Sequence, residues 1–512
     1  MTQTTPYAGA AGLNYFDGDS LLQRVLARRL PAGRRKPAAA ELSRLGALCG
    51  GRLSELIEAS QREDRWPKLE RYDRWGERVD RLVYCAEQLE LRRLSFEADC
   101  LPPAPLLERM AKAYLLNQNG ESGVTCPLAM TDGLIQLLED EGSTEQKSRW
   151  LPLLRDVGAF PPFTAGQFVT EMQGGSNVSE NETTAERAAD GTWRLTGLKW
   201  FCSNPGELWV TTAKPKGSQG IALFLMPRRR PDGSLNDCHI LRLKDLSGTR
   251  GKATAEVEYS GAYAELIGRP AHGMSLLLRV LRTSRLHVGA ASLGFLRRAL
   301  VEARLYSRAR LVLGRPMDTL PHVVETLRRL EASWTAGLLS YFEALWLLDQ
   351  GDRVADVLAP LLKIQISRRA TDGIREARLL LAGNAVLRDF SIFPRLAEDA
   401  LIQEIWEGTH PILAGHALRA LRRPASREAF FKLCALPRGK RGELAEEAAD
   451  AARRLREALA ALKPDLAEER AHEGLRLCDL AWRALSLSLL LREADGPLDV
   501  EGTFLSLARA LN

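Results

Sequence analysis

A change in periodicity near residue 163 limits the folds open to this chain of 512 residues more than any other feature. From there to about residue 266, short runs of β-branched, aromatic and aliphatic residues alternate with turn residues, such as Asp190-Gly191 and Pro231-Asp232-Gly233. Short runs bounded by such turn signals predict strands. We therefore expect a small all-β domain of roughly 100 residues in the middle of the chain.

Helical spacing of apolar residues dominates on both sides of this block. Residues 18–160 read mostly as helices. The pattern returns after the block in long stretches at 276–311, 323–348 and 354–381, which short breaks separate, as in a four-helix bundle. A further helical segment follows in 424–512.

The predicted fold is mostly α with an inserted β domain. A chain of this length is too long for a single core, so several domains are expected. We place an N-terminal helical domain at 1–160, the β domain at 161–272, a C-terminal four-helix bundle at 273–423 and an additional helical domain at 424–512.

Composition and charge exclude few functions. The net charge of +6 permits an acidic partner but does not require one, and acidic and basic residues nearly balance in 424–512, which disfavours DNA binding by this tail. Eight cysteines form no CxxC pair, so we expect reduced thiols and a cytoplasmic location. The histidines lack metal-ligand spacing, so no metal is expected. No secretory signal and no run of about twenty apolar residues is visible, so no membrane span is expected.

Glu407 is the first candidate for chemistry. The run LIQEIWEGTH, residues 401–410, reads as a helix that ends near Gly408, a residue that adopts backbone angles other residues disfavour. A helix end of this kind can aim Glu407 into a cavity beside Trp406, which makes its carboxylate a candidate general base. The alternative is an ordinary surface glutamate at a helix end.

Two further motifs lie in the β-rich block. VTEMQGGSNV, at 169–178, has two adjacent glycines and Ser176, a pattern that brings backbone N–H groups close to a bound anion such as phosphate. LTGLKWFCSN, at 195–204, reads as a strand in which Phe201 and Ser203 share one face. Such a face can stack on a flat ring and hydrogen-bond its edge. The alternative is a glycine turn followed by a core aromatic.

In this order the three motifs resemble those of the acyl-CoA dehydrogenase family of flavoproteins. The first is similar to the family pattern TEPxAGSDV, the second to a strand with a lysine, aromatics and Ser/Thr-Asn, and WEGT to the YEGT segment that holds the family's catalytic glutamate. The adaptive-response (AidB-like) branch is the most similar, through PRRRPDG at 227–233, PRLAEDALIQEIWEG at 394–408 and the additional C-terminal domain. The resemblance spans most of the chain and implies the family's helical, β-barrel-like and four-helix-bundle domains.

The resemblance also implies a bound FAD and an acyl thioester substrate, carried on CoA or on a carrier protein. Glu407 would remove the substrate's α-proton while a hydride leaves the β-carbon for the flavin. Self-association is implied as well, because the family's cofactor contacts cross a subunit interface. The remaining implied roles are Thr170, Phe201 and Ser203 at the flavin ring, Ser176 at the phosphates or the substrate, Arg285 at the substrate, and Arg310 and Thr409 at FAD.

Departures from the family pattern fall mostly on the part that grips the adenine and pyrophosphate. Leu313 stands where the family has a phenylalanine, and Pro321 stands where it has a glutamine. Ala382 and Ala385 replace glycines of the family's Gly-Gly-x-Gly loop, Glu398 replaces an arginine, and Pro411 replaces a polar residue. The residues implied to contact the flavin ring are kept. We therefore expect weaker FAD binding or an assembly that differs from the family's usual tetramer. A flavin-free descendant of the family is the remaining alternative.

Several functions compete at this point. The first is an FAD-dependent acyl-CoA dehydrogenase that oxidises a CH–CH bond. The second is a DNA-associated protective flavoprotein of the adaptive-response type, which needs several Lys/Arg contacts; the arginine-rich stretch 279–315 favours it, whereas the balanced tail does not. The third is a flavin oxidase acting on a nitroalkane or an amine-like metabolite. A non-catalytic scaffold is the fourth.

Overall fold

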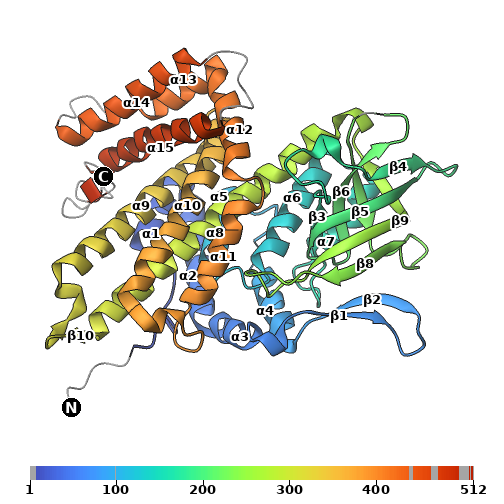
Figure 1. Ribbon diagram of the computed structural model, residues 1–512, viewed down its shortest axis with the longest axis horizontal. Helices are drawn as coiled ribbons and strands as arrows, with labels where there is room; N and C mark the ends of the chain where they lie inside the picture. Colours follow the sequence, from blue (N-terminus) through green and yellow to red (C-terminus); the bar gives the residue numbers. More distant parts are fainter. Residues whose placement is uncertain are drawn as a thin grey trace. The chain divides into compact units, whose positions relative to one another are not determined.

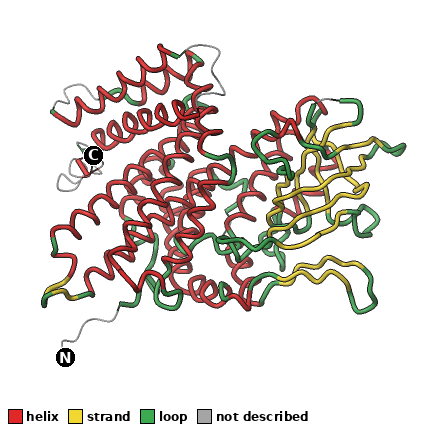
Figure 2. The backbone as a smooth tube through the Cα atoms, in the orientation of Figure 1, coloured by secondary structure: helices red, strands yellow, loops and turns green. Residues whose placement is uncertain are grey.

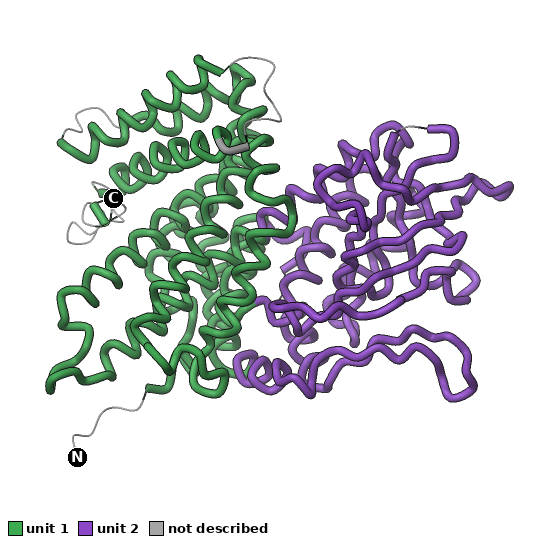
Figure 3. Tube along the Cα trace, viewed as in Figure 1, with its two compact units in different colours: residues 1–52, 106–120, 288–512 green, residues 53–105, 121–287 purple. Residues whose placement is uncertain are grey.

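The chain divides into two compact units in the computed structural model (Figure 3). The structure describes residues 7–98, 100–218, 220–436, 442–462 and 471–494, together with residues 507, 509 and 510. Unit 1 comprises Met1–Arg52, Leu106–Gly120 and Val288–Asn512, and unit 2 comprises Leu53–Pro105 and Glu121–His287. Each unit therefore combines segments that lie far apart in the sequence.

Seven strands of unit 2 form one sheet (Figures 1 and 2). They are β3 (Ala165–Phe168), β4 (Thr184–Arg187), β5 (Trp193–Ser203), β6 (Leu208–Pro215), β7 (Ala222–Pro227), β8 (Cys238–Leu243) and β9 (Thr254–Ile267). Hydrogen-bonded neighbours follow the ring β6–β4–β5–β9–β7, which closes because β7 also pairs with β6. β3 adds to β6 outside the ring and β8 adds to β9. The predicted β-barrel-like domain is therefore confirmed.

Large aromatic side chains fill the interior of this barrel. Phe168, Trp209 and Tyr259 are all buried, and the rings of Phe168 and Trp209 stack with centroids 5.0 Å apart. The indole N–H of Trp209 donates to the hydroxyl oxygen of Tyr259 at 3.0 Å. Each polar end of these aromatics thus has a partner inside the core, as buried Trp and Tyr require.

Residues 68–83 differ from the helical prediction for the N-terminal region. They form an antiparallel hairpin of β1 (Lys68–Tyr72) and β2 (Arg78–Val83). Charged residues at most positions hide the alternation of these strands. The turn is specified locally, because the carboxylate of Asp73 accepts from the backbone N–H groups of Trp75 and Glu77 at 2.8 and 3.0 Å, while Gly76 adopts a φ of +83°.

Helices accompany the barrel within unit 2. They are α3 (Ser54–Ser60), α4 (Ala86–Glu97), α6 (Thr125–Glu141), α7 (Thr144–Leu154) and the first part of α8 (Gly273–Ala309). α6 packs against β3, and α7 packs against α6. A capping box starts α7: Ser143 accepts from the backbone of Gln146 at 3.2 Å, and the Gln146 side chain accepts from the backbone of Ser143 at 3.0 Å.

Unit 1 is built almost entirely of helices, and α10 is at its centre because it contacts α9, α11, α12 and α15. The helices are α1 (Ser20–Arg29), α2 (Ala32–Leu48), α5 (Leu106–Asn117), the rest of α8, α9 (Pro321–Asp349), α10 (Ala355–Leu381), α11 (Phe393–Ile405), α12 (His410–Arg422), α13 (Pro424–Leu433), α14 (Glu443–Ala461) and α15 (Ala471–Glu493). Two-residue strands, β10 (Leu311–Val312) and β11 (Arg315–Pro316), form a small hairpin after α8. Within the described ranges, no helix is both long and apolar enough to cross a membrane.

Candidate functional site

The turn that carries Glu407 joins α11 to α12 and has an unusual backbone. α11 ends at Ile405, Trp406 is extended, and Gly408 has a φ of +104°. The sequence predicted a special conformation at Gly408, but Glu407 itself also lies in the left-handed region, with a φ of +57°. A residue with a side chain pays about 1–2 kcal/mol to adopt that conformation, so other contacts must hold the turn.

The ammonium group of Lys363 holds both ends of this turn. Lys363 lies on α10, is 1% exposed, and donates from Nζ to the carbonyl oxygens of Glu404 at 2.8 Å and Gly408 at 2.9 Å. One carbonyl belongs to the last turn of α11 and the other directly follows Glu407. Sequence reasoning missed Lys363; the available signal was a charged residue inside the apolar run LAPLLKIQI.

His410 begins α12 and lies beside the same turn. Its Nε2 is 3.1 Å from the hydroxyl oxygen of Ser367 and 3.8 Å from a carboxylate oxygen of Glu404. Burial, followed by the positive charges of Lys363 and Arg368, lowers the pKa of His410 to about 4. The imidazole is therefore neutral at pH 7.

In unit 2, a buried ion pair anchors the loop that follows β3. Nζ of Lys199 lies 2.6 Å from Oε1 of Glu171, and the same oxygen accepts from the hydroxyl of Thr183 at 2.6 Å. Burial opposes ionisation of Glu171, but the charge of Lys199 and these donors outweigh it and hold the pKa of Glu171 below its usual value. The carbonyl of the preceding residue, Thr170, accepts from the backbone N–H of Trp200 at 2.9 Å, so the loop is joined to β5 at two neighbouring points.

The adjacent glycines in this loop are required by its geometry. A Cβ on Gly175 would lie 2.4 Å from Oγ1 of Thr170, and Gly174 has a φ of +128°. The backbone therefore approaches Thr170 more closely than any residue with a side chain would allow. Ser176 follows on the exposed side of the loop. Thr170 and Ser176 thus lie on one short segment whose backbone conformation depends on Gly174 and Gly175.

Phe201 and Ser203 lie on the side of β5 opposite the fully buried Cys202, as the sequence predicted. The ring of Phe201 is 48% exposed, which is unusual for a phenylalanine in a barrel strand. Nζ of Lys244 lies 4.7 Å from the centroid of that ring and 3.5 Å from the centroid of Trp200. A core aromatic is therefore excluded for Phe201, whose ring is half-exposed and has Lys244 beside it.

The hydroxyl of Ser203 has two polar neighbours that sequence reasoning did not identify. Oγ of Ser203 is 3.1 Å from Oγ1 of Thr254 and accepts from Nζ of Lys252 at 3.3 Å. Lys252 is only 3% exposed and also donates to Thr254 at 2.9 Å. The next residue, Asn204, ends the strand with a φ of +53° and donates to the hydroxyl oxygen of Thr164 at 2.8 Å.

Three family models match the chain: the N-terminal domain of adaptive response protein AidB at residues 6–157, and the middle and C-terminal domains of acyl-CoA dehydrogenase at 166–262 and 271–421. Acyl-CoA dehydrogenase family member 11 of Caenorhabditis elegans is 32% identical over 437 residues, which cover 79% of this chain and 70% of the relative. The chain belongs to the acyl-CoA dehydrogenase family. The putative acyl-CoA dehydrogenase AidB of Escherichia coli (strain K12) is 31% identical over 389 residues, 70% of each chain, which confirms the AidB-like resemblance.

Solved structures confirm the fold of this acyl-CoA dehydrogenase family member. The crystal structure of C. elegans ACDH-11 in complex with C11-CoA superposes with a TM-score of 0.91 at 28% identity, covering 100% of this chain and 93% of the other. An acyl-CoA dehydrogenase complexed with FAD from Bacillus anthracis has a TM-score of 0.74 at 16% identity and supports the fold alone. The predicted family of flavin-dependent oxidoreductases, with its helical domains around a central β domain, is thus confirmed.

The residues of unit 2 fit the flavin that this family uses. Phe201 offers a half-exposed ring, Ser203 offers a hydroxyl two residues further along the same strand, and the backbone at Gly174, where an added Cβ would meet nothing within 4 Å, lies open to an anion. These are the three features that a planar ring, its polar edge and a phosphate require. On this basis Phe201, Ser203 and Thr170 would hold the ring and Ser176 the phosphates.

Three other predicted site residues lie on different elements. Arg285 is buried on the part of α8 that belongs to unit 2, two residues before His287, whose Nε2 lies 2.9 Å from a carboxylate oxygen of Asp132. Arg310 is exposed immediately after α8. Thr409 is the N-cap residue of α12, and its side chain accepts no capping hydrogen bond from that helix. Across the described residues, no group of three His, Cys, Asp or Glu side chains is placed to hold a metal ion.

The departures from the family pattern have clear local consequences. Ala382 has a φ of +51°, a backbone conformation suited to glycine, so the backbone at this residue is strained. Leu313 also has a positive φ, +50°, and is 95% exposed. Pro321 and Pro411 lie in the first turns of α9 and α12, where proline is tolerated because those N–H groups need no partner in the helix.

Proposed function

We propose that this chain oxidises an acyl thioester and that Glu407 is the base that removes the substrate's α-proton. The observation that carries the proposal is the Glu407 turn, where a left-handed backbone is bracketed by the two hydrogen bonds from Lys363. Strain of this kind persists only where the surroundings over-determine it, and it gathers at functional sites. An ordinary surface glutamate has no need of such support.

The chain's own residues position the substrate and accept its proton. Bound FAD supplies the acceptor for the hydride that leaves the β-carbon. The Glu407 carboxylate takes the α-proton, so one C–H bond breaks at each of two adjacent carbons and a C=C bond forms between them. Lys363 fixes the backbone on either side of Glu407, and the neutral His410 adds no charge to the turn at pH 7. Arg285 would contact the substrate, and Arg310 and Thr409 would hold FAD.

An acyl thioester is the substrate class that the comparisons support best. ACDH-11, which is 28% identical and matches this chain along its whole length, was solved with C11-CoA. A carrier-protein thioester presents the same acyl group and belongs to the same class. Nitroalkanes and amine-like metabolites are the second candidate class, because a carboxylate base beside a flavin can also remove a proton from them.

The test is anaerobic reduction of the FAD-loaded protein, followed by the loss of flavin absorbance. Short-, medium- and long-chain acyl-CoAs are compared with a nitroalkane of matched length. We expect bleaching by at least one acyl-CoA. The Glu407→Gln variant should keep its flavin, and its rate of flavin reduction should fall about 10²–10⁴-fold, which is the usual contribution of a general base. Glu428→Gln, an exposed carboxylate on α13, serves as the matched control. Bleaching by the nitroalkane alone, or at an unchanged rate in Glu407→Gln, contradicts the proposal.

We also propose that the chain self-associates through unit 1. Large apolar residues are exposed at the end of α10, in the adjoining 3-10 helix Ala382–Val386 and on α11; these are Leu379 (71%), Val386 (70%), Leu401 (50%) and Ile405 (62%). These three elements contact one another, and exposed apolar side chains on neighbouring elements are typical of protein contact surfaces. Light scattering on the purified protein should give a multiple of 56.7 kDa, and Leu379→Glu with Val386→Glu should reduce it to one chain. A single-chain mass for the unaltered protein would contradict the proposal.

The cysteines and the C-terminal charges bear on two remaining questions. We propose a reducing, cytoplasmic compartment, because none of the eight cysteines, all of which lie in the described ranges, forms a disulfide. The DNA-associated alternative gains no support from α14, where Arg453 pairs with Asp450 and with Glu457, so that this face presents balanced charge. Retention on DNA that weakens steeply with salt would revive that alternative.

A further inference from the structure

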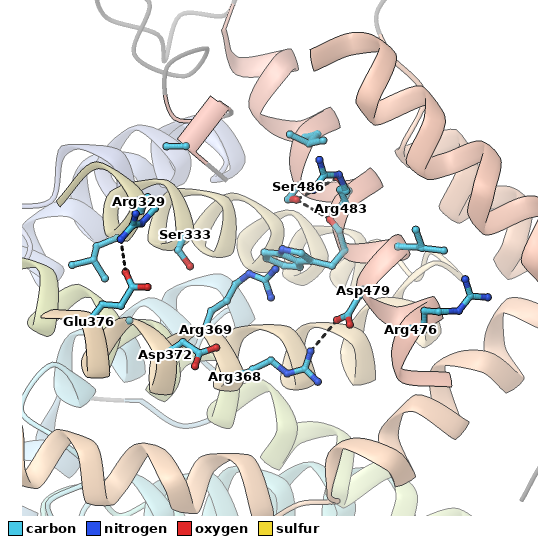
Figure 4. Close-up of a pocket in the computed structure, with 16 residues that line it drawn as sticks. Arg329, Ser333, Arg368, Arg369, Asp372, Glu376, Arg476, Asp479, Arg483 and Ser486 are labelled. Carbon is cyan, nitrogen blue, oxygen red and sulfur yellow. Dashed lines mark hydrogen bonds and ion pairs between the residues drawn. The ribbon is translucent and has the colours of Figure 1, made fainter. Parts of the chain in front are cut away.

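A cavity of about 540 Å³ opens within unit 1 between α9, α10 and α15 (Figure 4). The proposed oxidation assigns no role to these residues. Arginines from all three helices line it: Arg329, Arg368, Arg369, Arg476 and Arg483. Cavities of this size hold small organic ligands. The charges on the wall indicate which kind of ligand fits.

Four of these five arginines already have a carboxylate partner. Arg329 pairs with Glu376 at 3.5 Å, Arg368 with Asp479 at 3.0 Å, Arg476 with Glu473 at 3.9 Å and Arg483 with Glu447 at 3.1 Å. The remaining acid on the wall, Asp372, pairs with Arg375 at 3.5 Å. Each carboxylate on the cavity wall therefore forms its direct ion pair with an arginine other than Arg369.

Arg369 is held in place without a carboxylate. Its guanidinium carbon lies 4.6 Å from the ring centroid of Trp482, and its Nη1 donates to the side-chain oxygen of Gln365. Within the part of the chain that the structure describes, no carboxylate oxygen lies within 4.0 Å of this guanidinium. Burial lowers the pKa of Arg369 to about 10, so the group is still charged at pH 7. The carboxylates of Asp479 and Asp372 act on this guanidinium from beyond ion-pair distance. An incoming anion that contacts the guanidinium directly would stabilise its mostly buried charge further.

Apolar side chains line the cavity together with these charged groups. Leu330 on α9 and Leu480, Trp482 and Leu487 on α15 are among its lining residues, and the guanidinium of Arg369 extends toward the same space (Figure 4). We propose that this cavity binds an amphipathic anion, with a carboxylate or phosphate head group on Arg369 and an apolar body against the leucines and Trp482. A guanidinium is suited to either head group, because its fork of donors matches two oxygens of a carboxylate or a phosphate.

Calorimetric titration of the full-length protein tests the proposal with four probes. Octanoate and octyl phosphate carry the two head groups on the same chain, octanol lacks the charge, and inorganic phosphate lacks the apolar body. We expect octanoate or octyl phosphate to bind at least about tenfold more tightly than octanol and than inorganic phosphate. The anion that binds more tightly shows whether the cavity prefers a carboxylate or a phosphate head group. Equal binding of octanol and both anions, or no binding of any probe, overturns the proposal.

Variants then locate the site. Arg369→Gln should weaken binding of the preferred anion about tenfold or more, whereas Arg378→Gln, an exposed arginine on the same helix, should leave it unchanged. Unchanged affinity in Arg369→Gln would place the anion elsewhere and overturn the proposal. Hydrogen exchange on the unaltered protein gives a second measurement if Arg369→Gln does not fold. The anion should slow exchange in α10 and α15, and the absence of that protection also overturns the proposal.

Discussion

Replacing Lys363 with methionine tests the support of the Glu407 turn directly. Methionine has a similar length and is apolar, so it fills the same space within α10 and its neighbours. The substitution removes the donor of two hydrogen bonds and leaves the carbonyl oxygens of Glu404 and Gly408 without it. The main-chain support on both sides of Glu407 is lost in one step.

The size of the effect follows from the same contacts. A hydrogen bond from a charged donor contributes about 1.5–3 kcal/mol, so two contribute roughly 3–6 kcal/mol. Part of this sum is offset, because the 1% exposed ammonium of Lys363 no longer has to be desolvated. A net loss of about 2–3 kcal/mol remains, which exceeds the strain of about 1–2 kcal/mol in the left-handed backbone of Glu407. The turn should therefore relax, and a loss of that size in the transition state slows reduction by about 30- to 150-fold.

The assay is anaerobic stopped-flow reduction of the flavin by the best acyl-CoA, with flavin content measured in parallel. Lys432→Met, an exposed lysine on α13, is the matched control and should behave like the unaltered protein. NMR of His410 provides a readout that a general loss of stability would not move. Removing the Lys363 charge should raise the pKa of His410 above its value of about 4, because that charge is one cause of the low value. Unchanged reduction together with an unchanged pKa of His410 would refute the reasoning.

Three further predictions concern stability. Ala382→Gly should raise the free energy of unfolding by about 1 kcal/mol in urea titrations, since Ala382 has a φ of +51°; a decrease would show that its backbone is not strained. The pKa of His410 in the folded chain, about 4, lies below its ordinary value of 6.5, so the unfolded chain binds the proton more readily. The free energy of unfolding should therefore fall by about 1 kcal/mol from pH 7 to 5. His410→Gln should remove this pH dependence, and a pH dependence that persists in the variant would contradict the prediction. Glu171→Gln should cost about 3–5 kcal/mol by leaving Lys199 buried without its carboxylate, and adding Lys199→Met should recover much of the loss, so a double variant no better than the single one would count against the pair.

Most of the fold could be predicted from local sequence patterns. Turn pairs around short apolar runs located the β-rich block, and helical spacing located α8, α9 and α10, because both signals depend on neighbouring residues. Strands β3, β4 and β8 were not predicted individually. The β1–β2 hairpin was not predicted within the mostly helical N-terminal region. Its strands are charged along most of their length and belong to a two-stranded sheet, so no apolar alternation marks them.

The candidate site was only half visible in the sequence. Motifs identified Glu407, Phe201 and Ser203, because each lies in a compact run of unusual residues. Their supports were missed: Lys363 is 45 residues from Gly408, and Lys199 is 28 residues from Glu171. Pairings of this kind depend on how elements pack, and spacing along a single chain does not encode them.

The ring of strands in unit 2 also determines how that unit opens to solvent. β9 pairs with β5, β7 and β8, and β5 pairs in turn with β4, so the amide protons of β9 and β5 are covered along most of their length. No local fraying can expose the middle of β9 without separating it from several strands at once. Deuterium uptake there should therefore proceed only through cooperative opening of the whole barrel. The exchange rates of the central amides of β9 would then report the stability of unit 2 separately from that of the helices of unit 1.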